Sequence, residues 1–90
     1  MKIFAVVARA PSEGLKAAIT NAYPASHYQF TDTAWFVSDT TTAQGVSEKL
    51  NVVKGQNTGV VVVSVGSYYG VASTTLWDWM RSALEEAANG

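Results

Sequence analysis

Runs of apolar residues bounded by glycine, proline and polar residues predict four β-strands in this chain. The clearest run is residues 60–65, which holds five valines and one serine between Gly59 and Gly66. β-Branched residues favour strands, and a strand that is apolar on both faces requires cover on both faces. Similar patterns predict three more strands, at residues 3–8, 27–31 and 34–38.

Apolar residues at helical spacing predict three helices, each after a residue that can cap it. The first follows Ser12 and ends before Pro24. The second opens on a capping box of Thr41 and Gln44, and the third on Thr75 with its acidic partner at position 78. The predicted buried faces are Leu15, Ala18, Ile19, Ala22 and Tyr23 in the first helix, Val46, Leu50 and Val53 in the second, and Leu76, Met80, Ala83, Leu84 and Ala87 in the third.

The predicted elements follow the order strand, helix, strand, strand, helix, strand, helix. The first six match the ferredoxin-like βαββαβ arrangement, in which two right-handed βαβ units interleave into one antiparallel sheet with both helices on one face. We therefore predict an α+β fold, a ferredoxin-like sandwich with an additional C-terminal helix. At 90 residues the chain suits one domain, over 1–90, and is too short for two. Strands 3–8 and 34–38 are then central, and strand 60–65 lies at an edge.

Two helices cover only one face of such a sheet, so the apolar side chains of the other face need a different cover. The C-terminal helix can fold over it, or a second copy can pack face to face or edge to edge; we predict a homodimer, because large exposed apolar patches mark interfaces. Residues 66–71 are the arm expected to cross between protomers. Trp77 and Trp79 point about 200° apart on a helix, so one is expected to flank the core while the other reaches a neighbouring surface. The alternative is that both pack at the rim against the protein's own loops. The candidate interface residues are Trp35, Val37, Val61, Val63, Tyr68, Tyr69 and Trp79.

Composition narrows the classes of protein to consider. The chain has no cysteine, which excludes disulfides, thiolate metal sites and cysteine nucleophiles. Its net charge is −1, and its basic residues are spread from Lys2 to Arg81 instead of forming the basic run typical of nucleic-acid modules. No segment approaches the roughly 18 apolar residues of a membrane span, and Arg9 interrupts the N-terminal apolar run before a signal peptide could form. We expect a cytoplasmic protein that does not associate with membranes.

The residues that commonly carry catalysis form no recognisable motif. His27 is the only histidine, and no Gly-x-Ser-x-Gly elbow accompanies it. Asp32 and Asp39 bracket one strand, and the other carboxylates stand in helical or capping contexts; paired-acid catalysis would require two of them to converge. Residues 55–59 have the composition of a phosphate loop, but no Lys-Ser or Lys-Thr follows and the next element is a strand. We therefore predict no catalytic, cofactor-binding or metal-binding residue and favour a protein that is not an enzyme.

The layout over roughly residues 1 to 84 resembles small bacterial and phage proteins related to the CRISPR-associated spacer-acquisition nuclease and to VapD-like toxins. The resemblance lies in residue type and order within five segments, at residues 1–7, 33–37, 42–50, 60–66 and 77–80. It implies the ferredoxin-like fold, a homodimer and an association with phage or mobile elements. Catalytic members of that family carry a metal-binding aspartate directly after the first strand, where this chain reads Val7-Ala8-Arg9-Ala10. Neither alanine nor arginine can hold a divalent cation through a carboxylate, so the nuclease activity does not follow from the resemblance.

These observations favour a small, non-enzymatic, homodimeric ferredoxin-like module that binds a macromolecular partner, either a protein or a nucleic acid. The first alternative is an atypical metal-dependent nuclease of the resembling family. The second is a small-molecule-binding domain, in which the open sheet face and the aromatic pair Tyr68 and Tyr69 enclose an apolar pocket.

Overall fold

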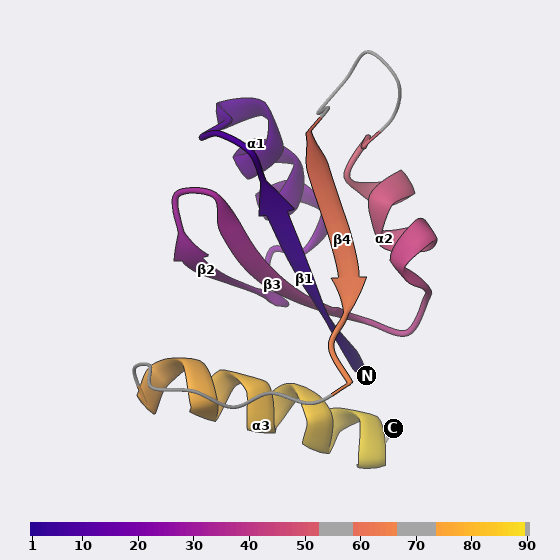
Figure 1. Cartoon of the computed structure of the whole chain (residues 1–90). Coiled ribbons are helices and arrows are strands. Elements are labelled where there is room, and N and C mark those ends of the chain that lie inside the picture. The colour runs from indigo at the N-terminus through magenta and orange to yellow at the C-terminus, as the bar shows by residue number, and fades with distance from the viewer. Residues whose placement is uncertain (53–58, 67–73, 90) are drawn as a thin grey trace.

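The computed structural model describes residues 1–52, 59–66 and 74–89 of the chain, with residues 85–89 described as backbone only. It is an α+β structure with one antiparallel sheet of four strands and three helices in the described residues (Figure 1). The elements in chain order are β1 (Lys2–Ala8), α1 (Glu13–Ala22), β2 (His27–Thr31), β3 (Ala34–Asp39), α2 (Ala43–Lys49), β4 (Val60–Ser64) and α3 (Thr74–Asn89). Each strand and helix expected from the sequence is present close to its predicted bounds.

The strands lie in the order β2-β3-β1-β4, and each is antiparallel to its neighbours. β1 and β3 are central and β4 is at an edge, as predicted. The register places Val6 opposite Trp35 on one side and opposite Val62 on the other. Because paired residues point to the same face, this register decides which apolar side chains meet beneath the sheet.

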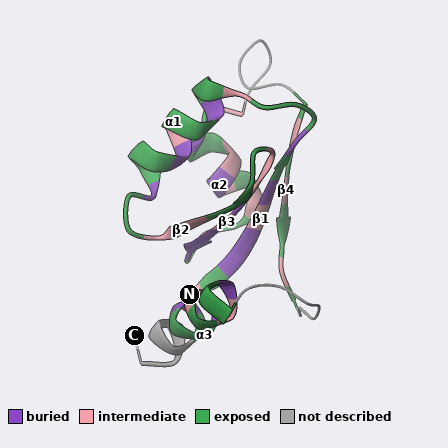
Figure 2. Cartoon of the chain, turned by 90° about the vertical axis from the view of Figure 1, so that its left-hand side faces the viewer, coloured by how far each residue is buried: buried purple, intermediate pink, exposed green. Residues whose placement is uncertain are grey.

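The main core lies between the sheet and the helices α1 and α2, which share one face of the sheet. Figure 2 shows the buried residues along β1 and β3 and on the inner sides of these helices. The central strands contribute side chains from alternate positions, as the two-residue period of a strand requires. The buried residues of this core are Phe4, Val6, Ala8, Leu15, Ile19, Tyr23, Trp35, Val37, Val46 and Leu50.

α1 begins where the sequence predicts, because the Ser12 hydroxyl accepts a hydrogen bond from the Leu15 backbone N–H at 3.2 Å. The cap predicted for α2 is wrong by one residue. Thr42 caps this helix, and its hydroxyl accepts from the Gly45 N–H at 3.1 Å. Thr41 instead packs against the backbone of Gly45, where a β-carbon would lie only 2.1 Å from the Thr41 Oγ1. α3 begins at Thr74, so Thr75 lies inside the helix and is not its cap.

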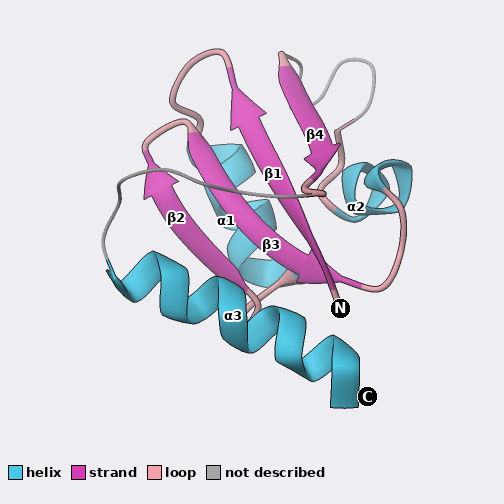
Figure 3. Ribbon diagram, turned by 60° about the horizontal axis from the view of Figure 1, so that its bottom comes forward, coloured by secondary structure: helices cyan, strands magenta, loops and turns pink. Residues whose placement is uncertain are grey.

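A second, smaller core lies under α3 on the opposite face of the sheet. It consists of buried Ile3, Leu76, Met80 and Ala83, with Tyr28, Phe36, Val65, Trp77 and Trp79 packed around them. Figure 3 shows α3 crossing the ends of β2 and β3 on the side opposite α1. The C-terminal helix therefore covers one end of the second face and leaves the rest of that face without intramolecular cover from the described elements. In the described residues, every helix falls short of the length and apolar character that a bilayer-spanning segment requires.

Candidate interaction surface

The face of the sheet opposite α1 and α2 carries large apolar side chains that remain exposed. Val7 is 46% exposed, Val61 59%, Val63 47% and Phe30 50%. These residues lie beyond the end of the sheet that α3 covers. We use the term open face for the exposed Val7, Phe30, Val61 and Val63 together with the half-buried Ala5, Ala34 and Phe36.

The open face is continuous across the sheet. Val61 and Val63 of β4 pair with Val7 and Ala5 of β1. The same two β1 residues pair with Ala34 and Phe36 of β3. The Phe36 ring then contacts the Phe30 ring of β2, with centroids 5.9 Å apart. The apolar side chains therefore form one patch. Single apolar residues on a surface are common and do not indicate an interface, whereas a contiguous patch does.

No charged side chain points to the open face from the described strands. Lys2 and Asp39 pair with each other and point to the other face, together with Phe4 and Val37. The strand residues of the open face therefore lack the cationic groups that a phosphate backbone requires. Its chemistry suits another apolar surface.

The two edge strands of the sheet, β2 and β4, differ in how well they are protected against pairing with a further strand. β2 carries His27, Gln29 and Thr31, and its ladder with β3 is irregular between Gln29 and Thr31. Polar side chains and bulges discourage pairing with further strands. β4 has the sequence Val-Val-Val-Val-Ser, with neither charge nor proline, so the edge beside the open face has no such protection.

The structure separates the candidate interface residues into three groups. Val61 and Val63 are exposed on the open face. Trp79 is half-buried and lies beside Tyr28, with ring centroids 6.2 Å apart. The prediction for Trp35 and Val37 needs correction, because both lie in the main core beneath α1 and α2 with exposed fractions of 2% and 0%.

Tyr68 and Tyr69 lie outside the described residues, as do the greater part of the predicted arm 66–71 and the apolar position Val53. The sequence reasoning missed Val7 and Phe30. Strand alternation could have found Val7, because positions 3, 5 and 7 of the first strand share the face opposite to Phe4 and Val6. Phe30 had no comparable signal, because the irregular ladder beside it breaks the simple alternation.

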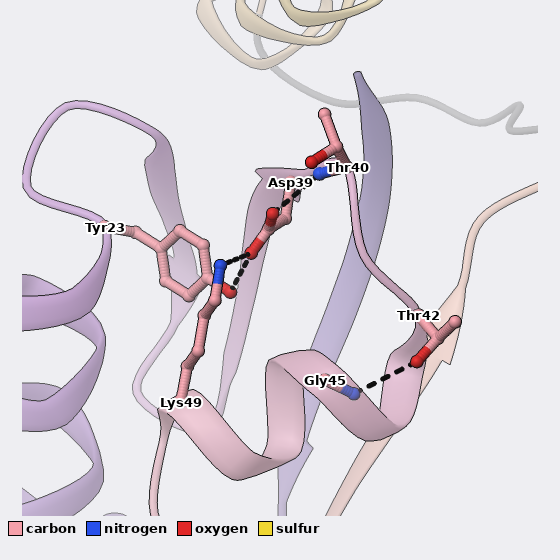
Figure 4. Close-up of polar contacts among 6 residues, drawn as sticks. All are labelled: Tyr23, Asp39, Thr40, Thr42, Gly45 and Lys49. Atoms are coloured by element: carbon pink, nitrogen blue, oxygen red, sulfur yellow. Dashed lines mark hydrogen bonds and ion pairs between the residues drawn. The ribbon is translucent and has the colours of Figure 1, made fainter.

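A cluster of polar side chains around Asp39 is the most connected charged group in the described residues (Figure 4). The Asp39 carboxylate accepts hydrogen bonds from the Tyr23 hydroxyl at 2.7 Å, from Lys49 Nζ at 2.6 Å and from the Thr40 backbone N–H at 2.6 Å. Lys49 Nζ also lies 5.9 Å from the centroid of the Tyr23 ring. The cluster joins the end of α1, the end of β3 and the last turn of α2.

Burial alone raises the pKa of Asp39, but the hydrogen bonds from Lys49, Tyr23 and Thr40 and the charge of Lys49 outweigh it, so the pKa lies below its ordinary value. Burial, with the hydrogen bond to Asp39 and the charge of that carboxylate, raises the pKa of Tyr23. The carboxylate is thus fully partnered and ionised, and Tyr23 stays protonated. This arrangement is suited to holding three elements together and offers no free base or nucleophile.

His27, the only histidine, stands at the start of β2 and is half-buried. Its Nδ1–H donates to the Tyr23 backbone carbonyl at 2.5 Å, since a carbonyl oxygen can only accept. Within residues 1–52, 59–66 and 74–89, no three histidine, aspartate or glutamate side chains gather in a way that could hold a metal ion.

Comparison of the chain with protein-family models, with curated proteins and with solved structures gave no match.

Proposed function

We propose that the chain is a ferredoxin-like, non-enzymatic module that forms a homodimer through its open face and binds a macromolecular partner as a dimer. The fold assignment is supported by the element order β-α-β-β-α-β before α3 and by the strand order β2-β3-β1-β4. One observation supports the dimer: Val7, Val61 and Val63 are each about half exposed on a contiguous face to which the described strands contribute no charged side chain.

The size of the open face is consistent with an interface centre. Four large apolar side chains, each about half exposed, form a patch on the order of a few hundred Å². A stable interface buries about 1,200–2,000 Å² over both partners, with an apolar centre and a polar rim. The open face supplies such a centre, and exposed Thr31, which pairs with Ala34 of that face, supplies a rim position.

A second copy fits this face better than a charged partner. A twofold axis places an apolar patch on an identical patch, so that no charge is buried unpaired. Stacked sheets lie about 10 Å apart, and a helix with its side chains is about 10–12 Å across. α3 packs on the same side of the sheet as the open face. Because the two thicknesses are similar, the sheet of a second copy can lie beside α3 in the same layer.

The dimer is tested by light scattering coupled to size-exclusion chromatography, from low to high micromolar protein. We expect the mass to rise from one chain of 9.6 kDa to two. Replacing Val61 and Val63 together by lysine should abolish this rise, because two charges would enter the interface unpaired. The matched control Thr20→Lys adds the same type of charge on the exposed side of α1 and should leave the dimer intact. A 9.6 kDa monomer at all concentrations contradicts the proposal.

A second variant separates face packing from edge pairing. Val65 N–H donates to Ile3 O, and Arg9 N–H donates to Gly59 O, at the two ends of the β1–β4 ladder. The alternation of an antiparallel ladder then directs the N–H of Ser64 to the outer edge of β4. Ser64→Pro removes that donor without changing the open face. We expect it to leave the dimer intact; loss of the dimer in this variant alone would assign assembly to the β4 edge.

The macromolecular partner is proposed to be a protein. The described residues hold five basic side chains, Lys2, Arg9, Lys16, Lys49 and Arg81; Lys49 and Arg81 are paired with Asp39 and Asp78, and the other three are spread over β1, the turn after it and α1. Fluorescence anisotropy with single-stranded and duplex RNA and DNA at physiological salt should therefore show no binding below about 10 µM. Tight, salt-dependent binding would make the partner a nucleic acid. Cleavage of these probes in Mg²⁺ or Mn²⁺ would instead support the nuclease alternative that the family resemblance implies.

A further inference from the structure

A cavity of about 220 Å³ lies between α3 and the end of the sheet where β2 begins and β3 ends. Ser38 of β3 ties this region together, because its backbone N–H donates to the Ser26 carbonyl at 3.0 Å. The cavity lining shares no residue with the open face. Six residues line it: Ala25, Ser26, Ser38, Trp79, Ser82 and Ala83.

The cavity lining combines hydroxyl groups with apolar surface and contains no charge. Ser26, Ser38 and Ser82 come from three different segments: the loop before β2, β3 and α3. A charged ligand would lose its hydration here without gaining an opposite charge, which is costly. The lining therefore favours a neutral ligand that can exchange hydrogen bonds with hydroxyls.

A second observation, independent of the shape of the cavity, indicates a ligand: the state of the Ser38 hydroxyl. Ser38 is only 5% exposed, yet its hydroxyl makes no hydrogen bond to any described residue. Every fully enclosed side-chain nitrogen or oxygen in the described part of the chain has a partner. The Ser38 hydroxyl oxygen is therefore not fully enclosed, and the cavity is a space that Ser38 lines. Buried hydroxyls are normally hydrogen-bonded, so this group is available to a molecule inside the cavity.

Trp79 supplies the aromatic residue of the cavity lining. The Tyr28 ring lies beside it, with the centroids 6.2 Å apart and the planes inclined by 48°. Such a tilted contact is favourable for an aromatic pair and restricts the motion of the indole. A planar ligand ring can stack on an indole held in this way.

We propose that this cavity binds a small, uncharged, planar molecule that carries an amide or hydroxyl group, with its ring against Trp79 and its polar group at Ser38. The volume equals that of about seven water molecules, below the range of drug-sized sites. It therefore admits a ligand of about ten non-hydrogen atoms. Ligands of this size have limited binding energy, and we expect dissociation constants on the order of a millimolar.

The test uses benzamide as the probe and benzoate as its matched charged analogue. Benzamide is titrated into ¹⁵N-labelled protein, and the indole N–H signal of Trp79 and the amide signal of Ser38 are followed by NMR. We expect saturable shifts at these two positions with benzamide and at least tenfold weaker binding of benzoate. Absence of saturable shifts at these positions, or equal binding of the two probes, overturns the proposal.

Three variants assign the effect to the cavity. Ser82→Leu places an apolar side chain in the lining from an exposed helix position, and it should abolish benzamide binding while the spectrum stays that of a folded protein. Ser38→Ala keeps the space but removes the hydroxyl, and it should weaken binding about tenfold. Thr75→Ala, on exposed surface of the same helix and outside the lining, should bind as the unaltered chain does. Unchanged binding in Ser82→Leu would place the probe elsewhere and contradict the assignment.

Discussion

Val7 of β1 pairs directly with Val61 of β4, and both side chains are about half exposed although they belong to one ladder of the sheet. The neighbouring pair in the same ladder, Val6 and Val62, faces α1 and α2, where Val6 is fully buried. The β1–β4 ladder thus carries apolar side chains on both faces, while the described elements cover this part of the ladder on one face only. That difference is the physical basis of the proposed self-association.

Replacing Val61 and Val6 by threonine should separate these two faces. Val61→Thr adds a hydroxyl at a 59% exposed position, and in dilute monomer it should change the free energy of unfolding by no more than about 0.5 kcal/mol. Val6→Thr buries the same hydroxyl in the main core and should cost about 1–3 kcal/mol. Urea denaturation at low micromolar protein measures both. Equal costs would show that Val61 is already covered in the monomer.

The same Val61→Thr variant has a second expected effect, on the concentration dependence of thermal unfolding. A dimer that dissociates on unfolding has a Tm that rises with protein concentration. We expect this rise in the unaltered chain and a smaller rise in the variant, because the substitution weakens the interface without unfolding the monomer. A Tm independent of concentration in the unaltered chain would count against the dimer.

Strand alternation predicted the sheet better than it predicted the exposed face. The central place of β1 and β3 followed from the ferredoxin-like order of the elements, which the apolar character of both strands fits. Trp35 and Val37 were nevertheless expected at an interface, because large apolar side chains suit either a core or an interface. Only the register, which sets Trp35 opposite Val6, shows that they point to the helices and that Phe36 points the other way. Register depends on pairing between distant segments, and a local pattern does not contain it.

The Asp39 cluster predicts a specific pH dependence of stability. The folded-state pKa of Asp39 lies below the unfolded value of 3.8, so the folded state binds fewer protons than the unfolded state. The contribution of Asp39 is therefore fully present above about pH 5 and is lost as the pH falls through the unfolded value towards the lower folded pKa. We expect the free energy of unfolding to decline over that window.

Asp39→Asn tests this assignment. The variant keeps the size of the side chain but removes the charge that pairs with Lys49, and it should cost about 1–3 kcal/mol at pH 7. Because the variant has no carboxylate to protonate, its deficit relative to the unaltered chain should shrink between about pH 5 and pH 2. Asp32→Asn, at an exposed turn position, is the matched control and should change stability by less than about 0.5 kcal/mol. A deficit that does not change with pH would contradict the assignment.

The cap of α2 illustrates what local sequence rules leave open. Thr40, Thr41 and Thr42 are consecutive, and a threonine three residues before Gln44 fits a capping box as well as the observed cap does. The hydrogen bond from the Gly45 N–H to the Thr42 hydroxyl decides between them. The cavity beneath α3 was equally beyond sequence reasoning, because Ser26, Ser38 and Ser82 are far apart in the chain and meet only where α3 crosses the sheet.

The corrected cap gives a direct comparison of neighbouring threonines. Thr42→Ala removes the acceptor for the Gly45 N–H and should cost about 1 kcal/mol. Thr41→Ala leaves that hydrogen bond in place and should cost less. Urea denaturation of the two variants measures the difference. If Thr41→Ala is the more costly, the helix is capped by the capping box predicted from the sequence.

The contact between Thr41 and Gly45 should appear as a coupling between two substitutions. Alanine favours a helix over glycine by about 1 kcal/mol, but a β-carbon at position 45 would lie 2.1 Å from Thr41 Oγ1 and 2.9 Å from its Cγ2. Gly45→Ala alone should therefore destabilise the chain. Combined with Thr41→Ala, which removes both of those atoms and leaves only the Thr41 Cβ at 3.0 Å, it should recover part of the stability, with a coupling free energy of about 1 kcal/mol or more in a double-mutant cycle. Additive effects would mean that Thr41 turns away from the helix at no cost and does not restrict position 45.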